Sequence, residues 1–93
     1  MATNIAPTHS FVYDGARINI FYASKGEGLP KHSHGFAHAT FCTAGSCYIR
    51  KEGKEIIADK FTQPINLLEN EWHEIEAVED NTVFINVFAD GKY

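Results

Sequence analysis

Hydrophobic residues in this chain alternate with polar ones or stand in short blocks, a pattern with the two-residue period of β-strands. Gly, Pro, Asn or Asp interrupts the pattern roughly every 8–12 residues, which is typical of short strands joined by turns. Helix signals are nearly absent. We expect strands at residues 11–13, 17–23, 39–43, 46–50, 55–58, 65–68, 72–78 and 82–89.

The connections follow from the same residues. Asp14-Gly15 and Asp80-Asn81 predict tight turns, and Ala44-Gly45 predicts a hairpin turn between the strands at 39–43 and 46–50. The glycine-rich stretch 25–31 is expected to be a loop. Many short strands at even spacing indicate an all-β sandwich or barrel, and closing the sheet would also protect its edge strands.

The length of 93 residues predicts a single domain, residues 1–93, with its core at about 11–89. A domain this small buries only about 60–65% of its unfolded surface, so a bound metal or dimerisation would add needed stability. The formal net charge of -4 disfavours nucleic acid and anionic membranes as partners. No apolar run is long enough for a membrane span, and the first residues do not resemble a signal peptide. With two cysteines only, we expect a reduced, cytoplasmic setting.

Three of the five histidines lie close together, at His32, His34 and His38. On a strand, residues i and i+2 share a face and stand about 7 Å apart, so His32 and His34 could lean toward one metal ion. In a straight strand His38 would stand about 13 Å from His34. A chain reversal around Gly35-Phe36 would instead bring His38 onto a neighbouring strand, beside the first two.

His73 is the expected fourth ligand, because it alternates with Ile75 and Ala77 on what should be the inward face of its strand. A single H-x-H pair occurs often by chance, but three histidines at these offsets with an inward fourth favour a metal site. Neutral imidazoles suit one divalent transition metal ion, namely Fe, Mn, Ni, Zn or Cu. Metal affinity should fall below a pH of about 6.5. His9, in the polar N-terminal segment, is expected to be a surface residue.

The stretch from Gly26 to Gly45 resembles the first motif of the cupin superfamily. Five residues separate Gly26 from His32-Ser33-His34, three more precede His38, and six separate His38 from Gly45. The family commonly has Glu where His38 stands, and His is a known variation. Residues 67–75 resemble the part of the second motif that delivers the last histidine, with Pro64 and Asn70 near the family's turn. The usual Gly and the final Asn of that motif are missing.

The resemblance covers about residues 11–89. It implies an antiparallel jelly-roll type β-barrel, also called a double-stranded β-helix, with the metal inside. It further implies that His32 and His34 lie on one strand, that His38 lies on the next, and that His73 lies across the barrel. Many small cupins are homodimers, so the resemblance also implies a homodimer.

Four protein ligands on an octahedral metal leave two positions open for a substrate, or for a substrate and dioxygen. We therefore expect a metal-dependent enzyme acting on a small organic molecule, with a dioxygenase-type reaction favoured. The alternatives are a non-catalytic metal-containing module that binds or senses a small ligand, a Lewis-acid isomerase or cyclase, and a metal-stabilised structural domain. No inward carboxylate is clearly placed as a general base, which weakens mechanisms that depend on proton transfer.

Strand parity predicts the residues of the pocket around the metal. Thr40 and Cys42 share the parity of His38, and across the next turn Cys47 and Ile49 should face inward. For the last strand the parity is ambiguous. Either Val83, Ile85 and Val87 or Phe84, Asn86 and Phe88 face the interior. Cys42 and Cys47 are expected to be small buried side chains, with a disulfide or a thiolate near the metal as alternatives. Trp72 should lie on the face opposite His73.

Overall fold

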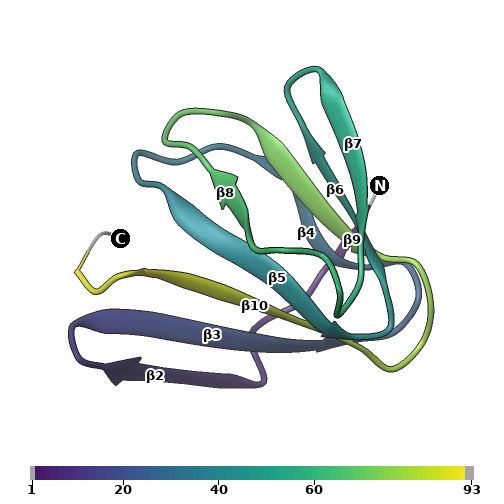
Figure 1. Ribbon diagram of the computed structural model, residues 1–93, viewed down its shortest axis with the longest axis horizontal. Coiled ribbons are helices and arrows are strands. Elements are labelled where there is room, and N and C mark those ends of the chain that lie inside the picture. The colour runs from purple at the N-terminus through teal and green to yellow at the C-terminus, as the bar shows by residue number, and fades with distance from the viewer. Residues whose placement is uncertain (1, 92–93) are drawn as a thin grey trace.

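The computed structural model describes residues 2–91, and in this part of the chain ten strands form two five-stranded sheets (Figure 1). The strands are β1 (Thr3–Asn4), β2 (His9–Tyr13), β3 (Ala16–Ala23), β4 (Glu27–His32), β5 (His38–Ala44), β6 (Cys47–Lys51), β7 (Lys54–Ala58), β8 (Ile65–Leu67), β9 (His73–Ala77) and β10 (Thr82–Ala89). No helix within residues 2–91 is long and apolar enough to cross a membrane.

The two sheets have the strand orders β1-β4-β9-β6-β7 and β2-β3-β10-β5-β8. All neighbouring strands are antiparallel except β1 and β4, which run parallel. The chain crosses repeatedly from one sheet to the other, for example from β3 to β4 and back to β5. This crossing is the jelly-roll pattern, so the expected all-β fold class is confirmed.

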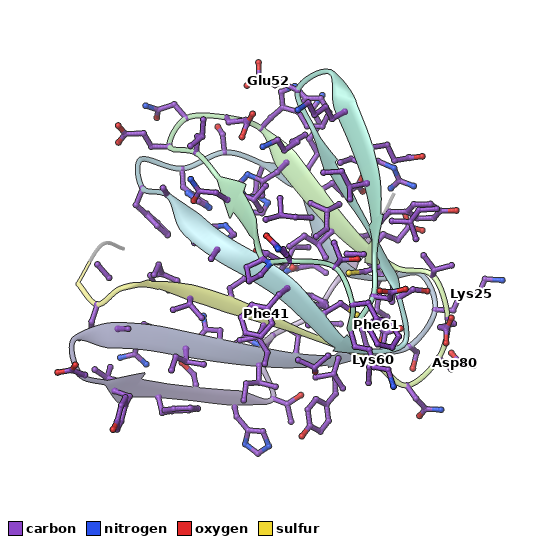
Figure 2. The ribbon with its side chains drawn as sticks, in the orientation of Figure 1. Lys25, Phe41, Glu52, Lys60, Phe61 and Asp80 are labelled. Atoms are coloured by element: carbon purple, nitrogen blue, oxygen red, sulfur yellow. The ribbon has the colours of Figure 1, made fainter. Side chains whose placement is uncertain are left out.

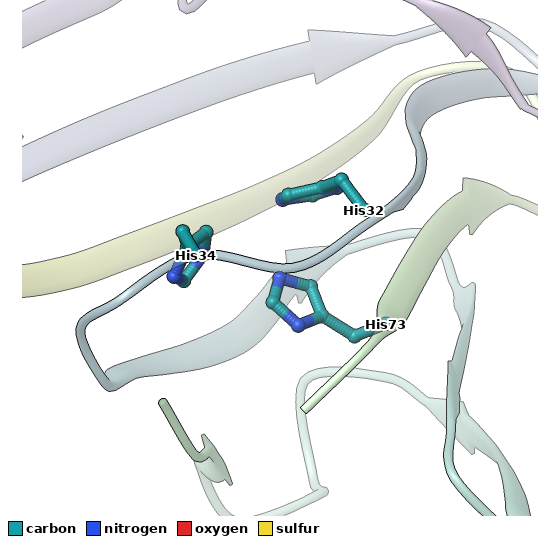
Figure 3. A group of neighbouring side chains, drawn as sticks. All are labelled: His32, His34 and His73. Atoms are coloured by element: carbon teal, nitrogen blue, oxygen red, sulfur yellow. The ribbon is translucent and has the colours of Figure 1, made fainter. Parts of the chain in front are cut away.

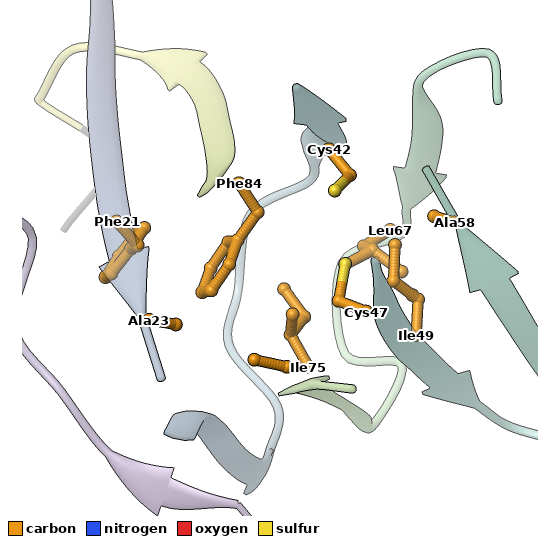
Figure 4. Close-up of a cluster of buried hydrophobic side chains, with 10 residues drawn as sticks. Phe21, Ala23, Cys42, Cys47, Ile49, Ala58, Leu67, Ile75 and Phe84 are labelled. Carbon is orange, nitrogen blue, oxygen red and sulfur yellow. The ribbon is translucent and has the colours of Figure 1, made fainter. Parts of the chain in front are cut away.

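Alternating side chains from the two sheets meet in one core (Figure 4). On β10 the buried residues include Phe84, Asn86 and Phe88, which resolves the ambiguous parity of the last strand. The ring of Phe84 stacks on that of Phe21 with the centroids 4.7 Å apart. From the other sheet, Ile49 and Ile75 complete the centre of the core. The period-two pattern therefore agrees with the buried face of each of these strands, and the packing decided that face for β10.

The prediction of a loop at residues 25–31 was wrong, because most of this stretch forms β4. Gly28 and Pro30 lower the β-propensity of the segment, but both have a structural reason to be there. A Cβ atom on Gly28 would lie 2.0 Å from the carbonyl oxygen of Ile75, so only glycine lets β4 approach β9 this closely. Pro30 falls where the β4–β9 register shifts, between Leu29 and His32, and a bulge tolerates a residue without an N–H.

The predicted hairpin between residues 39–43 and 46–50 was also wrong. β5 pairs with β10 and β8, whereas β6 pairs with β7 and β9 in the other sheet. The turn at Gly45 is thus a corner between sheets, and its φ of 66° lies in the region that favours glycine. A Cβ atom there would stand 2.5 Å from Oγ1 of Thr82. The short strand β1 was not expected either.

Charged side chains lie at several turns of the surface (Figure 2). Lys25, Glu52 and Asp80 lie at turns that point into solvent, and Lys60 stands 5.3 Å from the ring centroid of Phe61, which is 85% exposed. Such scattered contacts on the surface add little to stability. The chemistry of interest lies at one end of the interior, where β4, β5 and β9 meet.

Candidate metal centre

Four histidines converge from both sheets. His32 is the last residue of β4 and His73 the first of β9, and the two are direct cross-strand partners. His38 opens β5 in the opposite sheet, and His34 lies in the turn between β4 and β5. The expectation that His32 and His34 share a strand was therefore wrong, because β4 ends before His34. His73 lies beside His32 and across the interior from His38.

The ring nitrogens of these residues lie close together (Figure 3). The ligand atoms of His32, His34 and His73 all fall within 4.8 Å of one another. The Nε2 atom of His38 is 3.4 Å from the Nε2 atom of His73. His73 and His38 are buried, whereas His32 and His34 are half-buried on the side of the cavity described below.

Each of the four imidazoles is held through its other nitrogen, Nδ1. The Nδ1 atoms of His32, His34 and His73 lie 2.6 Å, 2.7 Å and 3.0 Å from the backbone carbonyl oxygens of Pro30, Phe36 and Glu71. A carbonyl oxygen only accepts hydrogen bonds, so these Nδ1 atoms carry the proton and the Nε2 atoms keep their lone pairs. This is the tautomer that second-shell partners impose on metal-bound histidines.

His38 is held by side chains instead of the backbone. Its Nδ1 atom lies 3.0 Å from Oγ1 of Thr40, which donates in turn to Oδ1 of Asn86 at 2.7 Å. With its own proton committed to Asn86, the Thr40 hydroxyl accepts from Nδ1–H of His38. The fourth imidazole therefore has the same tautomer as the other three, fixed by a buried chain of two hydrogen bonds.

The turn that carries His34 is tied to the loop before β9. The backbone N–H of Asn70 donates to the carbonyl oxygen of His34 at 2.7 Å, and Asn70 has a φ of 62°, a conformation that Asn tolerates. The ring of Phe36 stacks on that of His34 with the centroids 4.0 Å apart. These contacts hold His34 in place even though it lies outside a strand.

Burial and mutual proximity lower the pKa values of three of these imidazoles. Desolvation, followed by the neighbouring His73 and His34, lowers the pKa of His38 to about 3. Desolvation is also the main cause that lowers the pKa of His73 to about 4 and that moves the pKa of His34 below its usual value. These three rings are therefore neutral at pH 7, as metal ligands must be.

The donor set suits a divalent transition metal. A metal–imidazole bond is about 2.0–2.1 Å long, so two such ligands on one ion stand about 3.0–3.4 Å apart at tetrahedral or right angles. The 3.4 Å between the Nε2 atoms of His38 and His73 fits that separation. Two lone pairs facing each other at this distance repel unless a cation or a proton lies between them. The residues present are thus compatible with a metal site.

A cavity of about 300 Å³ opens beside the histidines. Its walls come from both sheets and from the segment after β1, and most are apolar. The lining residues are Ile5, Pro7, Asn19, Phe21, Leu29, His32, His34, Phe36, His38, Asn86 and Phe88. This volume is at the lower end of the range for small-molecule sites.

The predicted pocket residues are buried but lie elsewhere. Thr40, Cys42, Cys47 and Ile49 all face the interior, as parity predicted, yet none of them lines this cavity. Cys42, Cys47 and Ile49 belong to the packed hydrophobic core, and Thr40 is hydrogen-bonded to two of the cavity's lining residues, His38 and Asn86. The prediction failed because parity gives the face of a strand but not the position along the barrel.

Other predicted residues are found away from the cavity. Cys42 and Cys47 are buried free thiols, and desolvation raises the pKa of Cys47 to about 12. Trp72 lies outside, with Nζ of Lys31 4.4 Å from its ring centroid. His9 is an exposed residue of β2, as expected. Asn19, which lines the cavity, was not expected from the sequence, although its alternation with Phe21 and Ala23 was a usable signal.

Comparison with solved structures identifies the architecture. A cupin protein from Bacteroides fragilis superposes with a TM-score of 0.66 at 20% identity, covering 87% of this chain and 71% of that one. A cupin superfamily protein from Desulfitobacterium hafniense gives 0.71 at 11% identity, covering 91% and 81%. A putative mannose-6-phosphate isomerase from Ralstonia eutropha gives 0.71 at 15% identity, covering 92% and 82%.

No protein-family model matches the sequence, and a search of curated proteins found no match. The structural likenesses therefore establish the cupin fold of this chain, which confirms the resemblance seen in its histidine motif. At these identities they say nothing about the reaction. The chemistry has to be argued from the residues of this chain.

Proposed function

We propose that this chain is a metal-dependent cupin-fold enzyme that acts on a small organic molecule, with a reaction of dioxygenase type. His32, His34, His38 and His73 would hold one divalent ion of Fe, Mn, Ni, Zn or Cu. When bound, Fe or Mn would supply a redox-active centre beside the cavity, and the chain's own residues would bind and orient the substrate.

One observation carries this proposal: the Nδ1 atoms of all four histidines have hydrogen-bond partners that leave the Nε2 lone pairs pointing toward one another. Buried histidines that only pack would have no reason to share one tautomer. Because burial keeps at least three of the rings neutral, the cluster is ready to accept a cation at pH 7.

The cavity supports a small and mainly apolar substrate. Phe21, Phe36 and Phe88 offer ring surfaces, and Leu29 adds an aliphatic wall. Among the lining residues that the structure describes, none is Asp, Glu, Lys or Tyr. A reaction that depends on a general acid or base would lack that group, which favours oxidative chemistry over an isomerase or cyclase.

A second candidate is a module that binds or senses a small ligand without turnover. The same lack of a general acid or base in the cavity favours it. Under this alternative the metal would take part in ligand binding, and the ligand would leave unchanged. A purely structural role for the metal is disfavoured, because a domain that needs the metal only for stability would not need an open cavity beside the metal site.

The deciding experiment starts with protein purified without an affinity tag and analysed for its metal. Fe(II)- and Mn(II)-loaded protein is then offered a panel of small aromatic and aliphatic compounds while oxygen uptake and products are measured. We expect uptake to depend on one class of compound, to be lost in His73→Ala and to be kept in the surface variant His9→Ala. Equal uptake in His73→Ala would overturn the proposal. Ligand-dependent thermal shifts without product would support the binding module.

We also propose that the chain is a homodimer and works in the cytoplasm. β2 is an edge strand, and its five residues are exposed, including Phe11, Val12 and Tyr13. If β2 paired in antiparallel fashion with β2 of a second copy, the backbone N–H and C=O groups along its outer edge would be hydrogen-bonded in a two-fold symmetric dimer. Light scattering should give a dimer for the wild type and a monomer for a Phe11→Lys/Tyr13→Lys double variant. A wild-type monomer would contradict this proposal.

A further inference from the structure

Asn86 occupies an unusual place in the middle of the last strand. It lies between Phe84 and Phe88 on the inward face of β10 and is 6% exposed. Asn is a poor strand former, and burying its amide costs free energy unless the amide is hydrogen-bonded. A residue that weakens both the strand and the core suggests a role in the site it faces.

The register places Asn86 in a row of polar side chains across three strands. Its direct partners are Asn19 on β3 and Thr40 on β5. All three residues are buried, and the two asparagines line the cavity beside the histidines. Asn19 is oriented from the other side, because its Oδ1 atom accepts a hydrogen bond from Ser10 at 2.6 Å.

The hydrogen bonds fix which way the Asn86 amide points. Oδ1 accepts from Thr40, so the Nδ2 group is directed away from Thr40. Within residues 2–91, no buried side-chain nitrogen or oxygen lacks a hydrogen-bond partner. Among the described residues, Thr40 is the only one that hydrogen-bonds to the Asn86 amide, so Nδ2 is not buried in the core. Asn86 therefore presents an N–H donor to the cavity.

We infer that Asn86 is a specificity-determining residue, whose amide N–H donates to a carbonyl oxygen of a small, neutral and otherwise apolar ligand. This inference rests on the proposed function only in taking the cavity as the ligand site. A neutral carbonyl oxygen fits because the amide N–H is an uncharged donor in a mostly apolar wall, and none of the described lining residues is Lys or Arg. The rings of Phe21, Phe36 and Phe88 would enclose the apolar remainder.

The same side chain connects the ligand to the metal centre. From Asn86, one hydrogen bond leads to Thr40 and a second leads to His38. A ligand held by Asn86 is thus positioned relative to the imidazole cluster through rigid strand residues, not through a mobile loop. Asn86 acts as a binding and orienting residue and takes no part in bond breaking.

The test uses acetophenone and ethylbenzene, which share one carbon skeleton and differ in that a carbonyl group replaces the methylene group. Their affinities are measured by NMR titration on the full chain, both Zn(II)-loaded and metal-free. The wild type should prefer acetophenone by about three- to tenfold, the effect of one neutral hydrogen bond. The side-chain amide resonances of Asn86 should move with acetophenone and stay unchanged with ethylbenzene.

Two variants remove the donor in different ways. Asn86→Leu removes the whole amide, whereas Asn86→Asp keeps an acceptor for Thr40 but offers no N–H. In each variant the ratio of the affinities for acetophenone and ethylbenzene should be close to one. Asn66→Leu, at an exposed position of β8, is the matched control and should keep the preference. The inference is overturned if the preference survives in Asn86→Asp, if the amide resonances do not move, or if neither compound binds at millimolar concentration.

The metal-free arm separates this inference from the proposed function. If the chain binds no Zn(II) but still prefers acetophenone in a way that depends on Asn86, the metal proposal is wrong and the role of Asn86 stands. The other possible outcome is tight Zn(II) binding together with a preference for acetophenone that disappears without metal and is unchanged in the Asn86 variants. This outcome would mean that the carbonyl oxygen binds the metal. That result would overturn the inference and leave the metal proposal standing.

Discussion

The Nε2 atoms of His38 and His73 lie 3.4 Å apart, although the two residues are 35 positions apart in the sequence and belong to opposite sheets. Each imidazole is fixed through Nδ1, His38 by Thr40 and His73 by the carbonyl oxygen of Glu71. Two acceptors held face to face in a buried site form a place for a cation. This pair bridges the sheets and is the centre of the proposed site.

Replacing His73 by Ala should lower metal affinity by more than about 100-fold, because changes to outer-shell partners alone already cost 10–100-fold. His73 is fully buried, and its ring centroid lies 4.3 Å from that of His32 and 5.2 Å from that of His38. Competition with a coloured chelator would measure the affinity for Zn(II). His9→Ala, on the exposed strand β2, is the control and should bind as the wild type does. Unchanged affinity in His73→Ala would remove the basis of the site.

Thr40→Val keeps the shape of the side chain but cuts the hydrogen bond to His38. The imidazole then loses the partner that fixes its tautomer, so Zn(II) affinity should fall about 10–100-fold. The same chelator competition measures it. Thr43→Val, at an exposed position of the same strand, should have no effect. Equal affinities in the two variants would show that Thr40 only fills space.

The metal-free protein should lose stability as the pH falls from about 6.5 toward 4. Unfolded histidines take up protons near pH 6.5, whereas the folded pKa values of His38 and His73 are about 3 and about 4. In this window the unfolded state binds more protons, so acid favours unfolding. The urea concentration at the unfolding midpoint is measured in the presence of a chelator at pH 8, 7, 6 and 5. It should decrease as the pH is lowered below 7.

The matched variant for this pH effect is His38→Leu, which removes the group with the lowest pKa. Its midpoint should depend less on pH between 7 and 5 than that of the wild type. The carboxylates are the same in both proteins. The difference between the two curves therefore gives the contribution of His38 to the pH dependence of stability. A wild-type midpoint that stays constant or rises as the pH falls from 7 to 5 would contradict the burial of neutral rings.

Gly28→Ala should destabilise the protein by about 1–3 kcal/mol, the usual cost of overpacking. The new Cβ atom would meet the Ile75 carbonyl oxygen at 2.0 Å, so β4 must move away from β9. Because β4 ends at His32, metal affinity should drop as well. Gly35→Ala is the control, since a Cβ there has nothing within 4 Å. Urea unfolding measures both, and equal stabilities would show that β4 can shift freely.

The two thiols should be unreactive in the folded protein. Cys42 and Cys47 are buried, and desolvation raises the pKa of both, so little thiolate forms at pH 8. In native buffer a thiol reagent should modify Cys42 and Cys47 no faster than the protein unfolds. In urea the reaction should be fast. Fast reaction of either residue in native buffer would mean that this part of the core opens.

Sequence reasoning succeeded where a local rule was enough. The alternation of His73, Ile75 and Ala77 correctly predicted the inward face of β9, and Thr40 and Cys42 followed the parity of His38. It failed at β4, because Gly28 and Pro30 are typical of loops, whereas here close packing against β9 requires Gly28 and the register shift tolerates Pro30. It also failed at Gly45, where a corner between sheets has the same residues as a hairpin.

The sequence by itself determined most of the strands, the buried faces of several of them and the short spacing of three histidines, because side-chain direction in a strand depends only on the local backbone. Only the tertiary structure decided that His73 pairs with His32 and faces His38, and that Asn86 lies beside Thr40. Those neighbours depend on which distant strands share hydrogen bonds, and many pairings suit the same alternating pattern. The packing of the whole chain selects one of them, and with it the cavity and the site.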